Sequence, residues 1–191
     1  MGFEGVVLLL NKNKRLRLVF RTIVLSILVV TTIAVLYVNF QKDDPILEAG
    51  VEAPNFILDR MDSNEKIELD TLEGKGVMVN FWATYCEPCK KEMPFMEELY
   101  QEYQDQGIEI IAVSVDKNSM VIENFYNQFN LSFPLVHDKN GTIMEAYQVQ
   151  PLPTSYFINP DGTIERVVKG PLTLERLESY FKEILPNNNQ V

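Results

Sequence analysis

The sequence predicts an α/β fold, in which helices cover a sheet, preceded by one transmembrane helix. Two observations lead to this prediction. Residues 51–185 alternate between strand-like and helix-like patterns, and residues 22–40 contain no charged side chain. The chain has 191 residues and 46% hydrophobic content, which suffices for one domain with a packed core and an appendage.

The apolar run over 22–40 has nearly the length that a helix needs to cross the hydrocarbon core of a bilayer, at about 1.5 Å per residue. The segment before it, 1–21, is basic, whereas Lys42-Asp43-Asp44 follows it, and this asymmetry favours a cytoplasmic N-terminus. A cleaved signal peptide is the alternative. The run lacks an A-x-A-like site near its end and exceeds the apolar core of a typical signal peptide, so we expect a retained anchor.

These features divide the chain into five parts. We expect a cytoplasmic basic segment over 1–21, a transmembrane anchor over 22–40, a tether over 41–50, a folded domain over 51–186 and a short tail over 187–191. The protein is then a single-pass protein of the cell membrane, with its folded domain on the outer face and the lipid bilayer as a partner through residues 22–40.

The charge is unevenly distributed along the chain. The formal net charge is -10, from 17 basic and 27 acidic residues. Residues 1–41 hold five of the basic residues and one of the acidic ones, so residues 42–191 keep 12 and 26, a net charge of -14. A domain this acidic repels nucleic acid and anionic lipid headgroups. We therefore expect no nucleic-acid partner and favour basic protein partners.

The first half of the domain predicts a hairpin, a buried strand and a helix. Strand-like segments at 55–58 and 66–69 flank the turn-forming residues 62–64. Residues 76–83 form a near-continuous apolar run, as expected of a central strand buried on both faces. A helix follows and continues through Gln106, where Gly107 ends it.

The second half predicts further alternation of strands and helices. A buried strand covers 108–115, and a helix over 121–129 leads to a short strand over 135–137. A short helix, a hairpin across the turn at residues 159–162 and a closing amphipathic helix complete the domain; they cover 143–147, 155–158 with 164–168, and 174–185.

The only two cysteines, Cys86 and Cys89, flank Glu87-Pro88 where the predicted buried strand meets the predicted helix. Two cysteines and one histidine, His137, are too few for a structural zinc site. A structural disulfide across so short a loop would constrain the unfolded chain little. The helix N-terminus instead stabilises a thiolate at Cys86. We therefore predict a redox-active disulfide, with no metal and no other cofactor.

The segment FWATYCEPCKKEMP, residues 81–94, resembles the active-site segment of thioredoxins. Together with LPTSYFINPDG, residues 152–162, it resembles more closely the ResA-type extracytoplasmic thiol-disulfide oxidoreductases, which act in cytochrome c maturation. The resemblance covers about residues 50–185 and includes the N-terminal anchor. It implies a thioredoxin-like fold with an N-terminal hairpin and a central αβ insert.

The resemblance also implies roles for the cysteines and for a proline loop. Cys86 would be the exposed attacking thiol and Cys89 the more buried resolving thiol. A cis peptide bond before Pro153 would place the backbone of Leu152, Pro153 and Thr154 against Cys86, where it binds substrate by strand-like hydrogen bonds. Without the resemblance, Pro153 is equally an ordinary turn proline, since most X-Pro bonds are trans.

A proton partner for the cysteines is expected at Glu92. Thioredoxins carry an Asp beneath the resolving cysteine, but this sequence has Asn80 there, which cannot titrate. Glu92 lies three residues after Cys89, on the same face of the helix and among apolar residues, where burial would raise its pKa. Position alone leaves a solvated surface glutamate equally favoured. The resemblance favours a catalytic role, because the family carries a Glu at this position.

Three further residues near the cysteines are predicted to contact substrate. Glu87 disfavours a thiolate at Cys86 by like-charge repulsion, which makes the dithiol a better electron donor. Pro88 removes one N–H group and stiffens the loop. Trp82 is predicted to form part of the docking surface, with packing in the core as an equal alternative.

We expect the protein to act as a disulfide reductase on extracytoplasmic proteins. The family points to apocytochrome c, whose Cys-x-x-Cys-His disulfide must be reduced before haem attachment. A pair kept reduced outside the cell requires a membrane thiol carrier as electron donor. Two alternatives remain. A thiol peroxidase of the peroxiredoxin type is disfavoured because Thr84 lies two residues before Cys86 rather than three. A Cu(I)-binding module would use the two thiolates as soft ligands.

Overall fold

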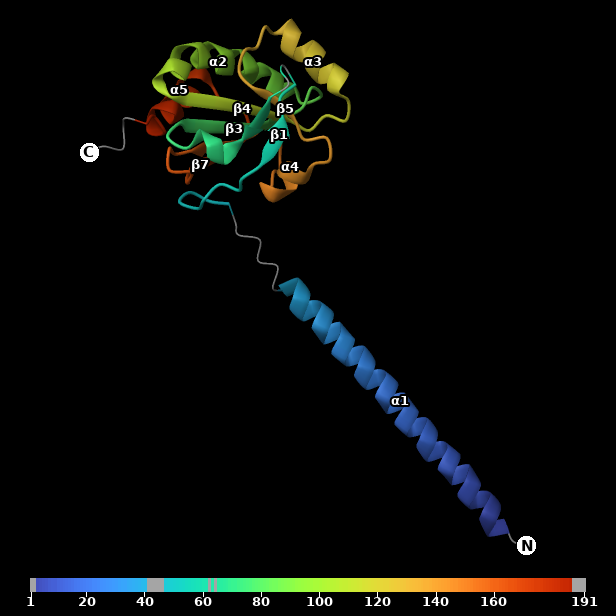
Figure 1. The fold of residues 1–191 in the computed structure, drawn as a ribbon. Helices are drawn as coiled ribbons and strands as arrows, with labels where there is room; N and C mark the ends of the chain where they lie inside the picture. The colour runs from blue at the N-terminus through green and yellow to red at the C-terminus, as the bar shows by residue number, and fades with distance from the viewer. Residues whose placement is uncertain (1–2, 41–46, 62, 64, 187–191) are drawn as a thin grey trace. The chain divides into compact units, whose positions relative to one another are not determined.

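Two units make up the chain, Met1–Ile46 and Leu47–Val191. A computed structural model describes residues 3–40, 47–61, 63 and 65–186 (Figure 1). The first unit carries one long helix, and the second carries the sheet, the remaining helices and both cysteines.

The helix of the first unit is α1 (Phe3–Phe40). Its stretch Leu16–Val35 is long and apolar enough to cross a membrane. Three hydroxyl groups in this region donate to backbone carbonyls three or four residues earlier, at 2.8 to 2.9 Å, so they need no outside partner; they belong to Thr22, Thr31 and Thr32. The helix begins well before the predicted anchor and includes the basic residues Arg17 and Arg21, since Leu, Lys and Arg all favour helix.

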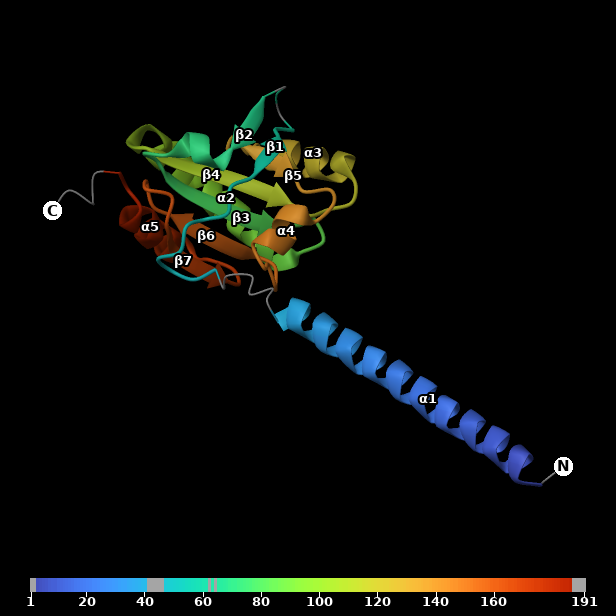
Figure 2. The ribbon, with the colours of Figure 1, turned by 60° about the horizontal axis from the view of Figure 1, so that its bottom comes forward.

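A five-stranded mixed sheet organises the second unit, with the strand order β5-β4-β3-β6-β7 (Figure 2). The strands are β3 (Gly76–Trp82), β4 (Ile108–Ser114), β5 (Leu135–His137), β6 (Thr154–Ile158) and β7 (Ile164–Lys169). The first three run parallel, whereas β6 pairs antiparallel with β3 and β7 antiparallel with β6. Every residue of β3 is buried, which explains its near-continuous apolar sequence.

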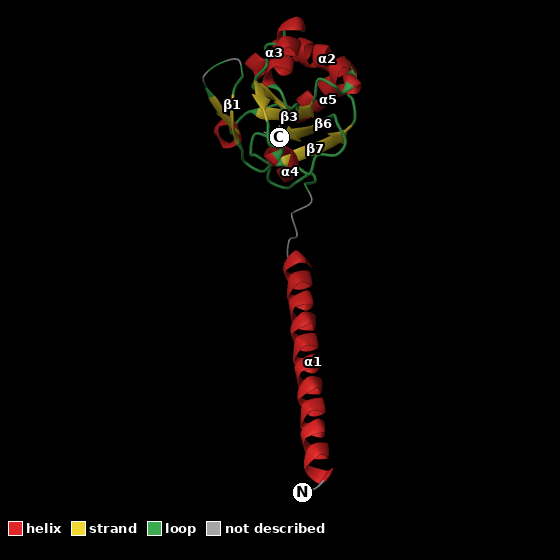
Figure 3. Cartoon of the chain, turned by 90° about the vertical axis from the view of Figure 1, so that its right-hand side faces the viewer, coloured by secondary structure: helices red, strands yellow, loops and turns green. Residues whose placement is uncertain are grey.

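Helices lie on both faces of this sheet. They are α2 (Glu87–Tyr103), α3 (Ser119–Gln128), α4 (Thr142–Ala146) and α5 (Leu174–Glu183), with a 3-10 turn η2 (Gln104–Gln106) after α2. Figure 3 shows α2, α3 and α5 on one side of the sheet and α4 on the other. Because α2 and α3 both connect parallel strands that advance in the same direction, right-handed crossovers place them on the same face.

Local signals explain where these helices begin and end. Gly107 adopts a positive φ of 95° and ends η2, as predicted. The helix predicted from residue 121 begins two residues earlier, at Ser119, because the side chain of Asn118 accepts a hydrogen bond from the N–H group of Met120 at 3.0 Å. The other predicted elements of the domain are confirmed within a few residues.

The predicted N-terminal hairpin is present as β1 (Ile57–Asp59) and β2 (Lys66–Glu68), followed by the 3-10 turn η1 (Leu69–Leu72). Of its predicted turn, residues 62 and 64 lie outside the described residues. The hairpin attaches to the edge strand β5, since the N–H group of Met61 donates to the carbonyl of Leu135 at 2.9 Å (Figure 2).

The second unit begins earlier than the predicted domain start at residue 51. Leu47 is buried, and the N–H group of Gly50 donates to the carbonyl of Ile164 at 2.7 Å. Residues 47–50, predicted as the end of a tether, therefore pack on the domain. The rest of the predicted tether, 41–46, and the predicted tail, 187–191, lie outside the described residues.

Candidate active site

The two cysteines form a disulfide at the point where β3 gives way to α2. Their sulfur atoms are 2.03 Å apart, and Cys86 is the N-cap residue of α2. Cys86 keeps 9% of its surface exposed, whereas Cys89, one turn into the helix, keeps none. The Cys86 sulfur accepts a hydrogen bond from the N–H group of Cys89 at 3.3 Å. This N–H group and the positive end of the helix dipole favour negative charge on that sulfur.

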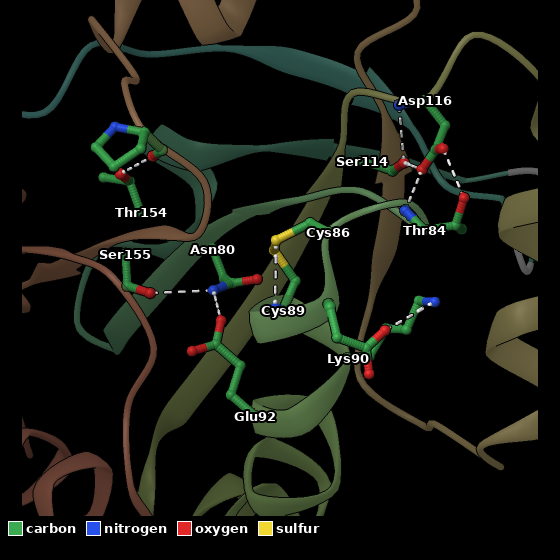
Figure 4. The surroundings of a disulfide bond; sticks show 12 residues. Asn80, Thr84, Cys86, Cys89, Lys90, Glu92, Ser114, Asp116, Thr154 and Ser155 are labelled. Carbon is green, nitrogen blue, oxygen red and sulfur yellow. Dashed lines mark hydrogen bonds and ion pairs between the residues drawn. A yellow bond between two sulfur atoms is a disulfide. The ribbon is translucent and has the colours of Figure 1, made fainter.

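Asp116 fixes the loop that precedes Cys86. Its Oδ2 accepts hydrogen bonds from the N–H group of Thr84 at 2.8 Å and from the hydroxyl of Ser114 at 3.0 Å, and its Oδ1 accepts from the hydroxyl of Thr84 at 2.7 Å (Figure 4). Asp116 and Ser114 stand at the carboxyl end of β4, next to the carboxyl end of β3. The buried carboxylate therefore determines where the chain passes from the sheet to Cys86.

Asp116 was not predicted from the sequence. Its signal was the pair of polar residues Ser114 and Asp116 at the end of a buried apolar strand, which is where ligands and catalytic groups gather in α/β folds. His137 belongs to the same region as a structural residue, because its Nε2 lies 2.7 Å from the backbone carbonyl of Asp116. The described residues contain no group of three or more His, Cys, Asp or Glu side chains that would hold a metal ion.

The start of α2 carries an exposed ion pair beside Cys86. Lys90 Nζ lies 3.4 Å from Glu87 Oε2, and both side chains reach solvent. Pro88 occupies the first turn of the helix, where its missing N–H group leaves no intrahelical bond unmade. The repulsion that the sequence analysis assigns to Glu87 is therefore partly offset by the neighbouring Lys90.

Glu92 is buried on the inner face of α2, with 1% of its surface exposed. Its Oε1 accepts a hydrogen bond from Nδ2 of Asn80 at 2.9 Å (Figure 4). Its Oε2 accepts one from the N–H group of Leu172 at 3.0 Å. Burial raises the pKa of Glu92 to about 7, and the two donors lower it only in part. The predicted burial of Glu92 is confirmed, and its carboxyl group can gain or lose a proton near neutral pH.

Asn80 connects Glu92 to the sheet. It lies on β3 opposite Ser155 of β6, and its Nδ2 donates to the Ser155 hydroxyl at 3.0 Å as well as to Glu92. All three side chains are buried. The sequence analysis considered Asn80 only as a residue that cannot titrate, and the strand register that pairs it with Ser155 is not readable from local patterns.

The proline loop has the predicted cis bond between Leu152 and Pro153. A second cis bond, between Gln150 and Pro151, was not predicted. Thr154 is fully buried, and its hydroxyl donates to the carbonyl of Pro151 at 2.6 Å, so its side chain supports the loop. Leu152 keeps part of its surface exposed. Of the three residues proposed to bind substrate, Pro153 and Thr154 are buried, and only Leu152 presents exposed surface.

The predicted position of Trp82 on a docking surface is wrong. Trp82 has 0% of its surface exposed and packs on Phe125 of α3, with ring centroids 4.9 Å apart. Its side chain lies on the face of the sheet that α3 covers, and the other face of β3 is buried as well. The large exposed aromatic residue beside the disulfide is Tyr85, with 72% of its surface exposed.

The chain is similar in sequence to known proteins. A model of the AhpC/TSA family matches residues 49–167. Thiol-disulfide oxidoreductase ResA from Oceanobacillus iheyensis is 46% identical over 182 residues, which are 94% of this chain and 95% of that protein. Thiol-disulfide oxidoreductase ResA from Bacillus anthracis is also 46% identical, over 91% of this chain and 99% of its own length.

Solved structures with a similar fold include the following two. StoA from Bacillus subtilis has a TM-score of 0.60 and 30% identity, covering 67% of this chain and 96% of that one. A thiol:disulfide interchange protein of the thioredoxin family from Chlorobium tepidum has a TM-score of 0.66 at 23% identity, over 70% of this chain and 95% of that one, and shows the shared fold.

A two-cysteine site at a helix N-terminus of a thioredoxin-like α/β fold, with these relatives, defines a thiol-disulfide oxidoreductase. The chain belongs to the AhpC/TSA family, within which it groups with the thiol-disulfide oxidoreductases named ResA.

Proposed function

We propose that this thiol-disulfide oxidoreductase works as a disulfide reductase, with Cys86 as the attacking thiol and Cys89 as the resolving thiol. The observation that supports these roles is their unequal burial at the start of α2, with 9% and 0% of their surfaces exposed. The Cys86 thiolate attacks a substrate disulfide and forms a mixed disulfide; Cys89 then attacks Cys86 and releases the substrate thiol. The protein loses two electrons and two protons to the substrate and becomes the disulfide form.

Glu92 is proposed as the proton acceptor for Cys89 in the second step. A thiol must lose its proton before it attacks a disulfide, and Cys89 has no exposed surface through which water could take that proton. Glu92 follows one turn later on the same helix face. Its pKa of about 7 lies near the operating pH, where a group exchanges protons most efficiently in both directions.

The direction of electron flow is proposed to be from this protein to its client. Glu87 next to Cys86 opposes the thiolate, and a dithiol whose thiolate is poorly stabilised is a stronger reductant. Lys90, 3.4 Å from Glu87, weakens but does not reverse this effect, because it is paired with the carboxylate rather than free. Regeneration requires an electron donor of the thiol class in the membrane.

A place at the outer face of the cell membrane is proposed from α1. Within its stretch Leu16–Val35, the three threonine hydroxyls donate to backbone carbonyls of the same helix, and Arg17 and Arg21 lie near the N-terminal end of the stretch. Basic residues on that side favour a cytoplasmic N-terminus. The site in the second unit would then face extracytoplasmic disulfides, among which the family resemblance favours the Cys-x-x-Cys-His disulfide of apocytochrome c.

Trapping experiments with the full chain in detergent test this proposal. The substrate is a peptide that carries an oxidised Cys-x-x-Cys-His segment, with the same peptide carrying a distant Cys pair as control. We expect Cys89→Ala to accumulate a mixed disulfide with the first peptide and Cys86→Ala to accumulate none. Trapping through Cys86→Ala instead would reverse the assignment of the two cysteines, and equal trapping of both peptides would contradict the client.

The reduction potential tests the direction of electron flow. Equilibration of the full chain with defined thiol buffers should give a value at or below about -230 mV, in the range of thioredoxin-like donors. A value near about -120 mV, typical of proteins that introduce disulfides, would contradict a reductase and leave the cysteine pair unaffected.

A further inference from the structure

Asn80 contains a buried polar atom without a partner. Its side chain has 0% of its surface exposed, and its Nδ2 makes two hydrogen bonds, to Glu92 at 2.9 Å and to Ser155 at 3.0 Å. Its Oδ1 is buried and finds no hydrogen-bond partner among the residues that the structure describes. An unpaired carbonyl oxygen in a protein interior costs free energy, so it calls for an explanation.

Asn80 contacts a residue that lies one helical turn from Cys89. Glu92, which Asn80 touches, lies three residues after Cys89, and residues three apart are neighbours on a helix face. Figure 4 shows the Oδ1 atom directed toward the Cys86–Cys89 disulfide, away from Glu92 and from Ser155. Cys89 is itself fully buried, so it has no access to water as a hydrogen-bond partner.

The orientation of the amide follows from its neighbours. When Glu92 is ionised, its carboxylate only accepts hydrogen bonds, so Nδ2 faces Glu92 and Oδ1 faces the other way. The opposite end of the amide then presents an acceptor to the cysteines. A disulfide has no hydrogen to donate, whereas a thiol has one. A thiol at Cys89, which forms when the disulfide is reduced, would supply a donor for Oδ1.

We propose that Asn80 is a positioning residue for the resolving cysteine: in the reduced protein, Asn80 Oδ1 accepts a hydrogen bond from the Cys89 thiol while Nδ2 remains bonded to Glu92. This inference rests on the proposed function, in which Cys89 cycles between disulfide and thiol. Reduction by an external dithiol delivers two electrons and two protons, breaks the Cys86–Cys89 bond and forms two thiols. One of the two protons resides on Cys89 and makes this bond.

The proposed hydrogen bond changes the balance between the oxidised and the reduced form of the protein. The oxidised protein leaves Oδ1 unpaired and the reduced protein satisfies it, so Asn80 favours the reduced form and orients the Cys89 proton away from Cys86. This effect moderates the electron-donating tendency that Glu87 provides, because it is opposite in sign. The same amide contacts the carboxylate that we propose as the acceptor of that proton. Asn80 therefore holds the donor and the acceptor of the proton in one arrangement without exchanging a proton itself.

Infrared spectroscopy of the S–H group tests the bond directly. Because the chain has only two cysteines, Cys86→Ala in the full chain leaves Cys89 as the single thiol. At pH 8, its S–H stretching band should lie at the lower frequency of a hydrogen-bonded thiol. Adding Asn80→Leu, which keeps a similar volume but removes the amide, should return the band to the frequency of a free thiol.

Ser155→Ala is the matched control, because it removes the other partner of Nδ2 and leaves Oδ1 in place. In the Cys86→Ala background it should keep the band of the hydrogen-bonded thiol. A free-thiol band for Cys86→Ala alone would overturn the proposal, and that measurement needs no substitution at Asn80. A band that Asn80→Leu leaves unshifted would overturn it as well.

The redox equilibrium provides a second readout in the two-cysteine protein. Asn80→Leu should lower the equilibrium constant for reduction by dithiothreitol about three- to tenfold, because the reduced form loses its bond; this corresponds to about 15 to 30 mV. Ser155→Ala should change the constant less than about twofold. Equal constants for the wild type and Asn80→Leu would contradict the role of Asn80, whereas a protein that dithiothreitol cannot reduce at all would contradict the proposed function itself.

Discussion

Two buried carboxylates flank the disulfide, and they differ in how completely they are bonded. Asp116, on the side of Cys86, accepts three hydrogen bonds from Thr84 and Ser114. Glu92, on the side of Cys89, accepts two, and burial raises its pKa to about 7. The comparison shows two uses of a buried carboxylate. Asp116 holds the loop before Cys86 in position, and the raised pKa of Glu92 lets its charge change near neutral pH.

The largest effect should come from Asp116→Ala. This change leaves the N–H group and hydroxyl of Thr84 and the hydroxyl of Ser114 without their acceptor, which should lower the free energy of unfolding by about 4 kcal/mol. Chemical denaturation of the oxidised full chain in detergent measures it. Asp116→Asn keeps one acceptor oxygen, so it should lower the free energy of unfolding less than Asp116→Ala does. A loss below about 1 kcal/mol for Asp116→Ala would show that the loop does not depend on this carboxylate.

The next effect concerns the pH dependence of stability at Glu92. Its pKa is raised from 4.5 to about 7 on folding, so the folded state binds this proton more tightly. The stability that this provides is complete below pH 4.5 and is lost as the pH rises through 7. Relative to Glu92→Gln, the wild type should therefore lose about 2.5 kcal/mol of unfolding free energy between pH 5 and pH 8.

The constant cost of placing a Gln amide between two N–H donors cancels in this comparison, because it does not depend on pH. Urea denaturation of both proteins at several pH values gives the difference. A difference between wild type and Glu92→Gln that stays constant from pH 5 to pH 8 would show that Glu92 does not titrate in this range.

A smaller effect on stability distinguishes the hydrogen bond of the Thr84 hydroxyl from that of its backbone N–H group. Thr84→Val removes only the hydroxyl that donates to Asp116 Oδ1 and keeps the N–H group that donates to Oδ2. The loss should be about 1 kcal/mol of unfolding free energy, the value of one hydrogen bond. Thr84→Ser keeps the hydroxyl and should lose less. If Thr84→Val destabilised as much as Asp116→Ala, the three bonds would act as one unit.

The smallest effect concerns the exposed pair of Glu87 and Lys90. Glu87→Gln removes a negative charge next to Cys86, which should raise the rate at which iodoacetamide alkylates the reduced protein at pH 7 about twofold. Lys90→Ala should lower this rate by a similar factor. The test depends on the two variants changing the alkylation rate in opposite directions. Identical changes would show that the charges do not act on Cys86 through electrostatics.

The sequence predicts the fold well because most of its signals are local. The apolar run at residues 76–83, the glycine at 107 and the turn at 159–162 each define an element without reference to distant residues. The burial of Glu92 was also predictable, since its spacing from Cys89 fixes its helix face.

The parts of the site that the sequence does not reveal depend on contacts across the sheet. Ser155 lies opposite Asn80 only because β6 pairs with β3 in one register, and Asp116 reaches Thr84 only because β4 ends beside β3. The position of Trp82 was predicted wrongly because an aromatic residue in this motif is equally compatible with the surface and with the core. Its burial depends on the contact with Phe125, which is distant in sequence.

The hydrogen bond from Leu172 to Glu92 has a consequence for the order in which the site is completed. The two residues are 80 positions apart, and Leu172 precedes the last helix of the domain. During synthesis from the N-terminus, the cysteines and Glu92 leave the ribosome long before the segment that buries and bonds this carboxylate. A nascent chain therefore carries both cysteines before the segment that bonds Glu92 exists. The surroundings of Glu92 become those of the mature protein only after the final tenth or so of the chain has been made and has folded.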